Sequence, residues 1–185
     1  YLKEKKVTFL GVGVSGGAKG ARFGPSIMPG GSKQAYNKVK KILEAVSAKV
    51  NDEPCVAYMG KGSAGNYVKM VHNGIEYAMM QLLAESYGIL KNIGGLNNEE
   101  LHQAYKKYNR GKLKSFLVEI TAEIFAQKDD LGKGMLIDKI LDKAKQKGTG
   151  KWTSQNAMDF GIPVPTIDAA VTMRGISSLK SERLA

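Results

Sequence analysis

The part of the sequence that most constrains the fold is residues 64–91, which has helical periodicity along its whole length. The run stops at Gly94 and Gly95, and glycine commonly follows the last turn of a helix. At about 100° per residue, a set of apolar residues falls on one side: Val71, Ile75, Ala78 and Leu82. The sequence therefore predicts one long helix with an apolar face.

The opposite face of this predicted helix carries chemically distinct polar groups. They lie within one arc of about 140° and are Lys69, His72, Asn73, Glu76 and Tyr77. A solvated helix face is usually filled with Lys and Glu, whereas this one combines an amine, an imidazole, an amide, a carboxyl and a phenol. The mixture favours a binding or catalytic surface, and a solvated face is the alternative.

Composition indicates a globular chain. Its 185 residues are 43% hydrophobic, enough for one domain or for parts of two. No apolar run approaches the roughly 20 residues of a membrane span, and no secretory leader opens the sequence. The single cysteine, Cys55, excludes an internal disulfide and agrees with a reducing cytosol. We therefore expect a cytoplasmic protein without membrane partners.

The charge balance indicates anionic partners. Lys and Arg total 28 against 17 Asp and Glu, a net charge of +11. These cations are dispersed and no nucleic-acid-binding motif is present, so a small anionic substrate is expected rather than nucleic acid. With Cys55 and only His72 and His102, no Cys/His metal site is expected, and a carboxylate-only site stays open.

The chain divides by composition near residue 61. A strand at residues 7–12, a Gly- and Pro-rich loop, a helix at 32–47 with Ser32 as N-cap, and a strand at 55–59 indicate the end of an α/β sheet domain, residues 1–61. Residues 62–185 predict an all-helical domain without strands. Its helices are expected at 64–91, 98–110, 115–127, 136–144, 153–159 and 166–183.

One motif matches a dinucleotide-binding fingerprint, G-x-G-x-x-G, at Gly11, Gly13 and Gly16. The fingerprint requires a helix that begins at its last glycines, and further Gly and Pro residues predict no helix before about residue 32. We therefore interpret the match as false. The loop is either an ordinary turn or a backbone cradle for a substrate carboxylate or hydroxyl, formed by Ser15, Gly16 and Gly17.

A second motif, "QKGTGKW", falls short of a P-loop because Lys145 stands where the first glycine is required and Trp152 follows Lys151. Lys147 and Thr149 beside flexible glycines still predict an oxyanion site, with a solvated turn as the alternative. Arg174 lies among apolar neighbours and would be costly if buried without a partner, so we expect it to face an anion.

Five stretches together resemble the 6-phosphogluconate dehydrogenase family, in its order and at nearly its spacing: "GVSGGAKGARFGPSIMPGG", "VKMVHNGIEYAMMQL", "FLVEITAEI", "ILDKAKQKGTGKWT" and "SSLKSERL". The chain departs from the family pattern at Lys145, where a small residue is usual, at Ala18 and Lys19, where acids are common, and at Asn66, where His is common.

The resemblance implies an activity. The family oxidises 6-phosphogluconate with NADP, releases CO2 and forms ribulose 5-phosphate, a reaction of the pentose phosphate pathway that requires no metal. It also implies a homodimer built on the helical domain. The first half of the family's coenzyme domain, which carries the main cofactor site, has no counterpart here. We therefore expect the isolated 185-residue chain to be inactive.

The resemblance also implies roles for individual residues. Lys69 would be the general base and Glu76 the acid. Ser15, Gly16 and Gly17 would hold the substrate carboxylate, and His72 and Asn73 its hydroxyls. The phosphate would be bound by Tyr77, Lys147, Thr149 and Arg174. Two alternatives stay open: another β-hydroxyacid dehydrogenase, which would lack the phosphate set and the Glu76 acid, or a non-catalytic helical module that binds anionic partners.

Overall fold

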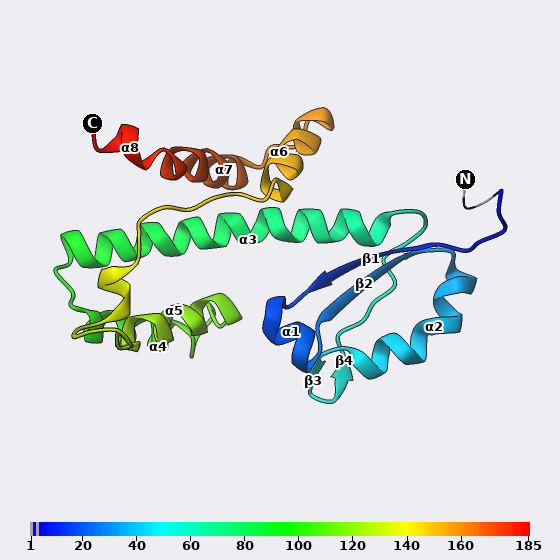
Figure 1. The fold of residues 1–185 in the computed structure, drawn as a ribbon, viewed down its shortest axis with the longest axis horizontal. Coiled ribbons are helices and arrows are strands. Elements are labelled where there is room, and N and C mark those ends of the chain that lie inside the picture. Colours follow the sequence, from blue (N-terminus) through cyan, green and yellow to red (C-terminus); the bar gives the residue numbers. More distant parts are fainter. Residues whose placement is uncertain (1, 3) are drawn as a thin grey trace. The chain divides into compact units, whose positions relative to one another are not determined.

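The computed structural model describes residue 2 and residues 4–185, which form two compact units, Tyr1–Asn73 and Gly74–Ala185. Helix α3 (Ala64–Gly88) begins in the first unit and continues in the second (Figure 1). The first unit contains a small sheet with helices, and the second is helical. The expected fold class, the end of a dinucleotide-binding α/β domain followed by an all-α domain, is confirmed.

The sheet of the first unit is built from strands β1 (Leu10–Ser15) and β2 (Ser26–Gly31), which pair antiparallel with Gly13 opposite Met28. Helix α1 (Gly17–Phe23) joins them, and helix α2 (Lys33–Val46) follows β2. The hydroxyl of Ser32 accepts a hydrogen bond from the Ala35 amide at 3.4 Å, so the predicted N-cap of α2 is confirmed.

A further backbone segment, residues 55–60, runs parallel to β2. The Ile27 amide donates to the Cys55 carbonyl at 2.9 Å, and the Met59 amide donates to the Pro29 carbonyl at 2.8 Å. Its pairing consists of isolated bridges instead of the continuous strand predicted at 55–59. The short strands β3 (Lys49–Val50) and β4 (Glu53–Pro54) form a hairpin just before it.

Two further predictions for the first unit are wrong. The first strand covers residues 10–15 instead of 7–12, and the expected loop contains both α1 and β2. Helix α1 forms although glycines flank it, and its buried Gly20 lies close to Pro25: a Cβ on Gly20 would lie 3.4 Å from the Pro25 Cα. Tertiary packing of this kind overrides local propensity.

The helix after Gly16 also removes the reason for which the glycine fingerprint was rejected. A helix does follow the last glycine of the motif, with Gly16 as its N-cap. The strands on either side of α1 are nevertheless antiparallel, whereas the fingerprint belongs to a parallel strand, helix, strand unit. The motif is therefore not a dinucleotide-binding fingerprint, because the strands around it have the wrong topology.

The core of the second unit lies between the C-terminal half of α3 and helices α4 (Asn98–Tyr108) and α5 (Phe116–Ala126). Its fully packed members are Leu101, Tyr105, Val118, Ala122 and Phe125, and Leu83, Tyr87 and Leu90 pack against them. The Tyr87 and Phe125 rings stack with centroids 5.3 Å apart. Helix α3 closes in a π-helical turn, η1 (Ile89–Ile93), directly before the predicted stop at Gly94.

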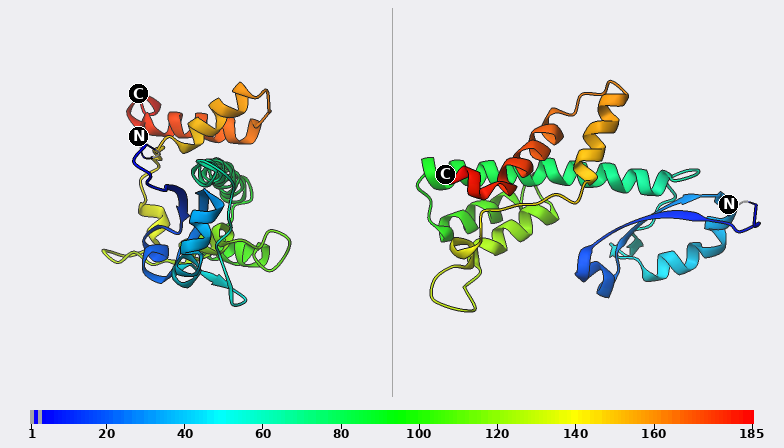
Figure 2. Two further views of the ribbon diagram at one scale, coloured as in Figure 1. Left: turned by 90° about the vertical axis from the view of Figure 1, so that its right-hand side faces the viewer. Right: turned by 45° about the horizontal axis from the view of Figure 1, so that its top comes forward.

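The remaining helices lie on the other side of α3 from α4 and α5, as the views in Figures 1 and 2 agree. They are α6 (Thr149–Asp159), α7 (Pro165–Ser178) and α8 (Lys180–Arg183). Helix α6 begins before the predicted residue 153, and the chain breaks at Leu179 where one helix over 166–183 was predicted. These differences matter for the site, because α6 begins directly after Lys147 and Gly148.

The prediction of a helix at residues 136–144 is wrong. Only a 3-10 turn, η2 (Leu136–Lys139), forms there, and residues 140–148 are irregular. Within them the Lys143 amide donates to the Leu141 carbonyl at 2.8 Å, while the Ala144 amide and the Lys145 carbonyl bond to side chains of α7. Across residue 2 and residues 4–185, no helix has the length and apolar character needed to cross a membrane.

Candidate active site

Glycines allow the beginning of α3 to lie directly against the sheet of the first unit. A Cβ on Gly65 would lie 2.5 Å from the Gly11 carbonyl oxygen, closer than real Cβ contacts come. A Cβ on Gly13 would likewise lie 2.6 Å from the Cβ of Lys69. The stem of Lys69 therefore packs against β1 at a position that only glycine permits.

The loop of Ser15, Gly16 and Gly17 directly follows the part of β1 that contacts α3. Side chains of a strand alternate between faces, so Ser15 shares its face with Gly11 and Gly13. Gly13, two residues before Ser15, faces Lys69. Gly16 and Gly17 have φ values of 150° and 56°, and no atom lies within 4 Å of where a Cβ of Gly17 would be. The backbone of the loop is thus open at Gly17.

The Lys69 amine lies among polar partners on its own helix. It donates a hydrogen bond to the Asn73 side-chain oxygen at 2.6 Å and lies 3.4 Å from Nδ1 of His72. All three side chains are half-buried. The offsets of three and four residues predicted this grouping, because such residues are neighbours on a helix surface. The Lys69 amine is therefore held by the side-chain amide of Asn73, an acceptor without charge.

In the second unit, Tyr77 lies at the centre of a group of contacts. Its side chain is 8% exposed, and the Arg174 guanidinium covers the ring at 4.1 Å from the centroid. A Cβ on Gly150 of α6 would lie 2.5 Å from the ring, so α6 also passes close to it. The preceding residue, Glu76, is half-buried.

The backbone before α6 meets the Tyr77 hydroxyl. The Lys147 amide donates to this hydroxyl at 3.1 Å, which leaves the hydroxyl hydrogen available for another acceptor. Arg174 donates to the Lys145 carbonyl at 2.8 Å, and Gly148 caps α6 in a left-handed conformation with φ of 96°. The Lys147 side chain is exposed, and Thr149 is the first residue of α6.

The apolar face predicted for α3 differs in its burial from the expectation. Ile75 and Leu82 are 49% and 55% exposed, whereas Ala78 on the same face is buried. The polar face also packs in the second unit, through Tyr77 against α6 and α7. Periodicity separated the two sets of residues but did not indicate which members of each set are buried.

The predicted site residues thus form two groups. The first unit groups Lys69, His72 and Asn73 on α3, and the strand that leads to the loop of Ser15, Gly16 and Gly17 touches Lys69 at Gly13. The second unit groups Tyr77, Lys147 and Arg174, with Glu76 and Thr149 adjacent in sequence to members of this group. Lys69 and Glu76 lie seven residues apart on α3, which corresponds to two turns or roughly 10 Å along the axis.

Some contacts around this site were not foreseen. Met80 Sδ receives a hydrogen bond from Arg174 at 3.5 Å, and the Lys145 carbonyl receives another. Both are contacts over long sequence separations for which the pattern of residues gives no signal. In the described part of the chain, no three His, Cys, Asp or Glu side chains come together in a way that could hold a metal ion.

Comparison with known proteins gives consistent matches over the whole chain. A family model described as "6-phosphogluconate dehydrogenase, C-terminal domain" matches residues 65–185, and one described as "NAD binding domain of 6-phosphogluconate dehydrogenase" matches residues 1–73. The chain is 59% identical over 181 residues to the chloroplastic 6-phosphogluconate dehydrogenase, decarboxylating 3, of Arabidopsis thaliana, covering 98% of this chain and 37% of that protein. It is 58% identical over 183 residues to the NADP(+)-dependent, decarboxylating 6-phosphogluconate dehydrogenase of Bacillus subtilis (strain 168), covering 99% and 39%.

Solved structures agree. The 6-phosphogluconate dehydrogenase of Plasmodium falciparum, described in its apo form and in complexes with NADP+ and with 6-phosphogluconate, matches with a TM-score of 0.93 at 57% identity. The match covers 99% of this chain and 39% of that one. A 3-hydroxyisobutyrate dehydrogenase from Salmonella typhimurium shares the fold, with a TM-score of 0.68 at 20% identity over 94% of this chain and 56% of that one.

The chain therefore spans 37% and 39% of the length of the Arabidopsis and Bacillus relatives that it matches. Both family models come from one enzyme family, and together they leave no part of residues 1–185 unmatched. This chain belongs to the 6-phosphogluconate dehydrogenase family.

Proposed function

We propose that residues 1–185 form the substrate-binding part of an NADP-dependent enzyme that converts 6-phosphogluconate to ribulose 5-phosphate and CO2. The observation that carries the proposal is the group around Tyr77. Its hydroxyl accepts from the Lys147 amide at 3.1 Å, and Arg174 covers its ring. A phenol hydrogen, an ammonium and a guanidinium are donors suited to a phosphate. A β-hydroxyacid dehydrogenase for an unphosphorylated substrate would not need this set.

The substrate is proposed to lie along α3. Tyr77, Lys147, Thr149 and Arg174 hold its phosphate, while Ser15, Gly16 and Gly17 hold the carboxylate end. His72 and Asn73 bind hydroxyls. The proposal is supported by the roughly 10 Å between Lys69 and Glu76 along the helix, which leaves room for a sugar acid. We retain the domain boundary near residue 61, with the α/β part before it and the helical part after it.

Lys69 and Glu76 have different roles in this proposal. Lys69 takes the proton of the C3 hydroxyl as C3 is oxidised, and the resulting ammonium then donates a hydrogen bond to the C3 carbonyl oxygen. This bond stabilises the negative charge that develops on that oxygen as the C1 carboxylate leaves as CO2. Glu76 finally donates a proton to the carbon that lost CO2, which becomes C1 of the product. No metal takes part.

NADP is the oxidant in this proposal, but the described residues do not form its main site. The Gly11 to Gly16 motif lies between antiparallel strands and opens a helix of seven residues, whereas a pyrophosphate site needs a parallel crossover. We therefore place the main cofactor site outside residues 1–185 and derive no step through the cofactor here. For the same reason the isolated chain is expected to form no NADPH.

We further propose a homodimer built on the helical unit. Exposed apolar side chains on α3 and α6 support a covering partner, among them Ile75, Leu82, Trp152 and Met158. A cytoplasmic location is also proposed, although several relatives carry the word chloroplastic in their names. No nucleic acid or membrane partner is proposed.

The proposal is tested in a full-length chain, called here the completed enzyme, in which residues 1–185 replace the matching segment of the Bacillus subtilis relative. It should bind 6-phosphogluconate and form NADPH and CO2 from it, and it should bind gluconate far more weakly. Calorimetry with 6-phosphogluconate, gluconate and random-sequence DNA compares the proposed function with its two alternatives, another hydroxyacid dehydrogenase and a non-catalytic anion-binding module. Equal affinity for both sugar acids would support a different hydroxyacid substrate, and preferential binding of DNA would support a non-catalytic anion-binding module.

The phosphate set leads to a specific prediction. Lys147→Ala or Arg174→Ala in the completed enzyme should each weaken binding of 6-phosphogluconate by about 1.5 to 3 kcal/mol, the value of a charge-assisted hydrogen bond. Binding of gluconate should change little, because it has no phosphate. Calorimetric dissociation constants for both ligands measure the difference.

Lys151→Ala is the matched control, since it removes one exposed cation from α6 without touching the proposed phosphate set. If Lys147→Ala discriminates phosphorylated from unphosphorylated substrate as well as Lys151→Ala does, then Lys147 is not a phosphate ligand. The same comparison applies to Arg174.

A further inference from the structure

The irregular segment of residues 140–148 is held by side chains of α7. The Ala144 amide donates to the Ser177 hydroxyl at 2.8 Å, and the Lys145 carbonyl accepts from Arg174 at 2.8 Å. Near its end, the Lys147 amide donates a hydrogen bond to the Tyr77 hydroxyl. Its conformation therefore depends on contacts with α7 and α3, since no regular hydrogen-bond ladder fixes it.

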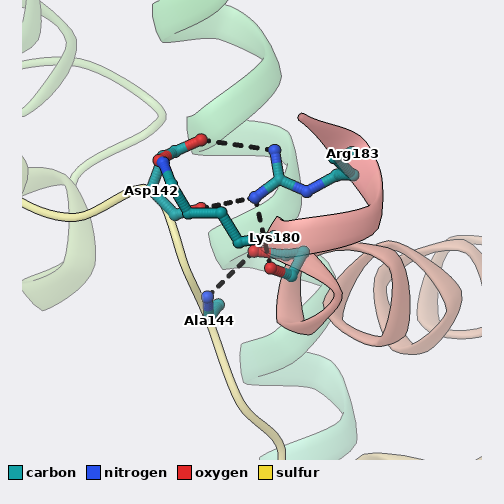
Figure 3. Close-up of polar contacts among 5 residues, drawn as sticks. Asp142, Ala144, Lys180 and Arg183 are labelled. Carbon is teal, nitrogen blue, oxygen red and sulfur yellow. Dashed lines mark hydrogen bonds and ion pairs between the residues drawn. The ribbon is translucent and has the colours of Figure 1, made fainter. Parts of the chain in front are cut away.

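Asp142 joins this segment to α8 (Figure 3). Its carboxylate forms ion pairs with Lys180 and, at 3.2 Å, with Arg183. Arg183 also donates to the Asp142 carbonyl at 2.8 Å and to the Ser177 carbonyl at 3.3 Å. One guanidinium therefore contacts the side chain and the backbone of Asp142 together with the last turn of α7.

This cluster has a geometry that a simple surface ion pair lacks. The Asp142 side chain is 62% exposed, and a lone pair at such a site contributes little to stability. Arg183, however, binds the segment through a carboxylate and a carbonyl at once, and planar guanidinium donors give such contacts a fixed direction. The expected consequence of the cluster is therefore local order in the segment, with only a small effect on global stability.

We propose that Asp142, through Lys180 and Arg183, is a positioning residue for the phosphate end of the substrate. It holds residues 140–148 on α7 and α8, so that Lys147 is presented beside Tyr77. The inference rests on the proposed function, because the ligand so placed is the phosphate of a sugar acid. None of the three residues of the cluster touches the substrate in this proposal.

The test is Asp142→Ala in the completed enzyme. KM for 6-phosphogluconate should rise about fivefold to tenfold, a magnitude between that of a lone surface pair and that of a direct ligand. The value of kcat should stay within about twofold, since Lys69 and Glu76 are untouched. Asp142→Glu keeps the carboxylate and should stay close to the wild type.

The matched control is Asp138→Ala, which removes another acid of the same unit with an ion pair to Lys91 at 3.1 Å and a hydrogen bond from Asn98 at 2.7 Å. A purely structural role predicts equal effects of the two substitutions on KM. Such equality, or a fall in kcat without a rise in KM, would overturn the inference.

Hydrogen exchange separates this inference from the proposed function, because it requires no ligand. The amides of Ala144 and Lys147, both bonded to side chains, should exchange faster in Asp142→Ala than in the wild type and Asp138→Ala. Unchanged exchange overturns the inference whatever the enzyme acts on. Failure of the wild type to use 6-phosphogluconate would instead overturn the proposed function.

Discussion

Lys69→Met in the completed enzyme should lower the rate of NADPH formation by about 10² to 10⁴, the usual contribution of a general base. Methionine keeps much of the lysine stem, which packs against β1 at Gly13, but it removes the amine. Binding of 6-phosphogluconate should survive within about tenfold, because the phosphate and carboxylate contacts remain. Steady-state kinetics together with calorimetric binding would separate the two effects.

Lys91→Met is the control for this experiment. Lys91 lies in the π-helical continuation of α3, so Lys91→Met likewise removes an ammonium group from this part of the chain. It also removes the ion pair with Asp138. It should leave turnover near normal. Near-normal turnover of Lys69→Met would mean that the polar face of α3 is only structural, and the assignment of Lys69 as base would be wrong.

The helices could be predicted where local signals determine them. Ser32 caps α2, Ser115 caps α5, and the glycines after residue 93 close α3. These signals act within one turn of the chain, so the sequence displays them directly. The starts of α2 and α5 consequently agree with the predictions to within about one residue, the range in which helix assignments themselves differ.

The parts that could not be predicted depend on distant partners. Strand β2 includes Pro29 and Gly30, residues that disfavour strands, and it forms because β1 on one side and residues 55–60 on the other pair with it. A helix was predicted at 136–144, but there Ala144 bonds to Ser177, and the next residue, Lys145, bonds to Arg174. No spacing in the sequence specifies either set of contacts.

The same distinction applies to the site. The contact of Lys69 with Asn73 followed from their offset on one helix, and the structure contains it. The contact of Lys147 with Tyr77 joins residues 70 positions apart. The resemblance placed both residues in one phosphate set, but only the structure shows that the backbone of Lys147 occupies the Tyr77 hydroxyl. Because the hydroxyl oxygen accepts from this amide, its hydrogen stays available for donation to the proposed phosphate.

Glu76→Gln should separate the end of the reaction from its beginning. The amide keeps the size of the carboxyl but cannot deliver a proton, so protonation of the enediol should slow by about 10² to 10⁴. Oxidation at C3 depends on Lys69, seven residues earlier on α3, and should be less affected. In a single turnover, NADPH should therefore form much faster than ribulose 5-phosphate, and exchange of solvent hydrogen into C1 should be suppressed.

Glu85→Gln tests whether any carboxyl on α3 has the same effect. Glu85 lies on the same helix, is exposed, and accepts a hydrogen bond from Gln81 at 2.8 Å. Its substitution should leave both the rate of NADPH formation and the exchange at C1 unchanged. If Glu76→Gln slows oxidation and protonation equally, Glu76 affects the site as a whole and is not the acid. If Glu76→Gln preserves exchange at C1 at the wild-type rate, another group supplies the proton. The assignment of Lys69 as the base at C3 and Glu76 as the acid at C1 is then wrong.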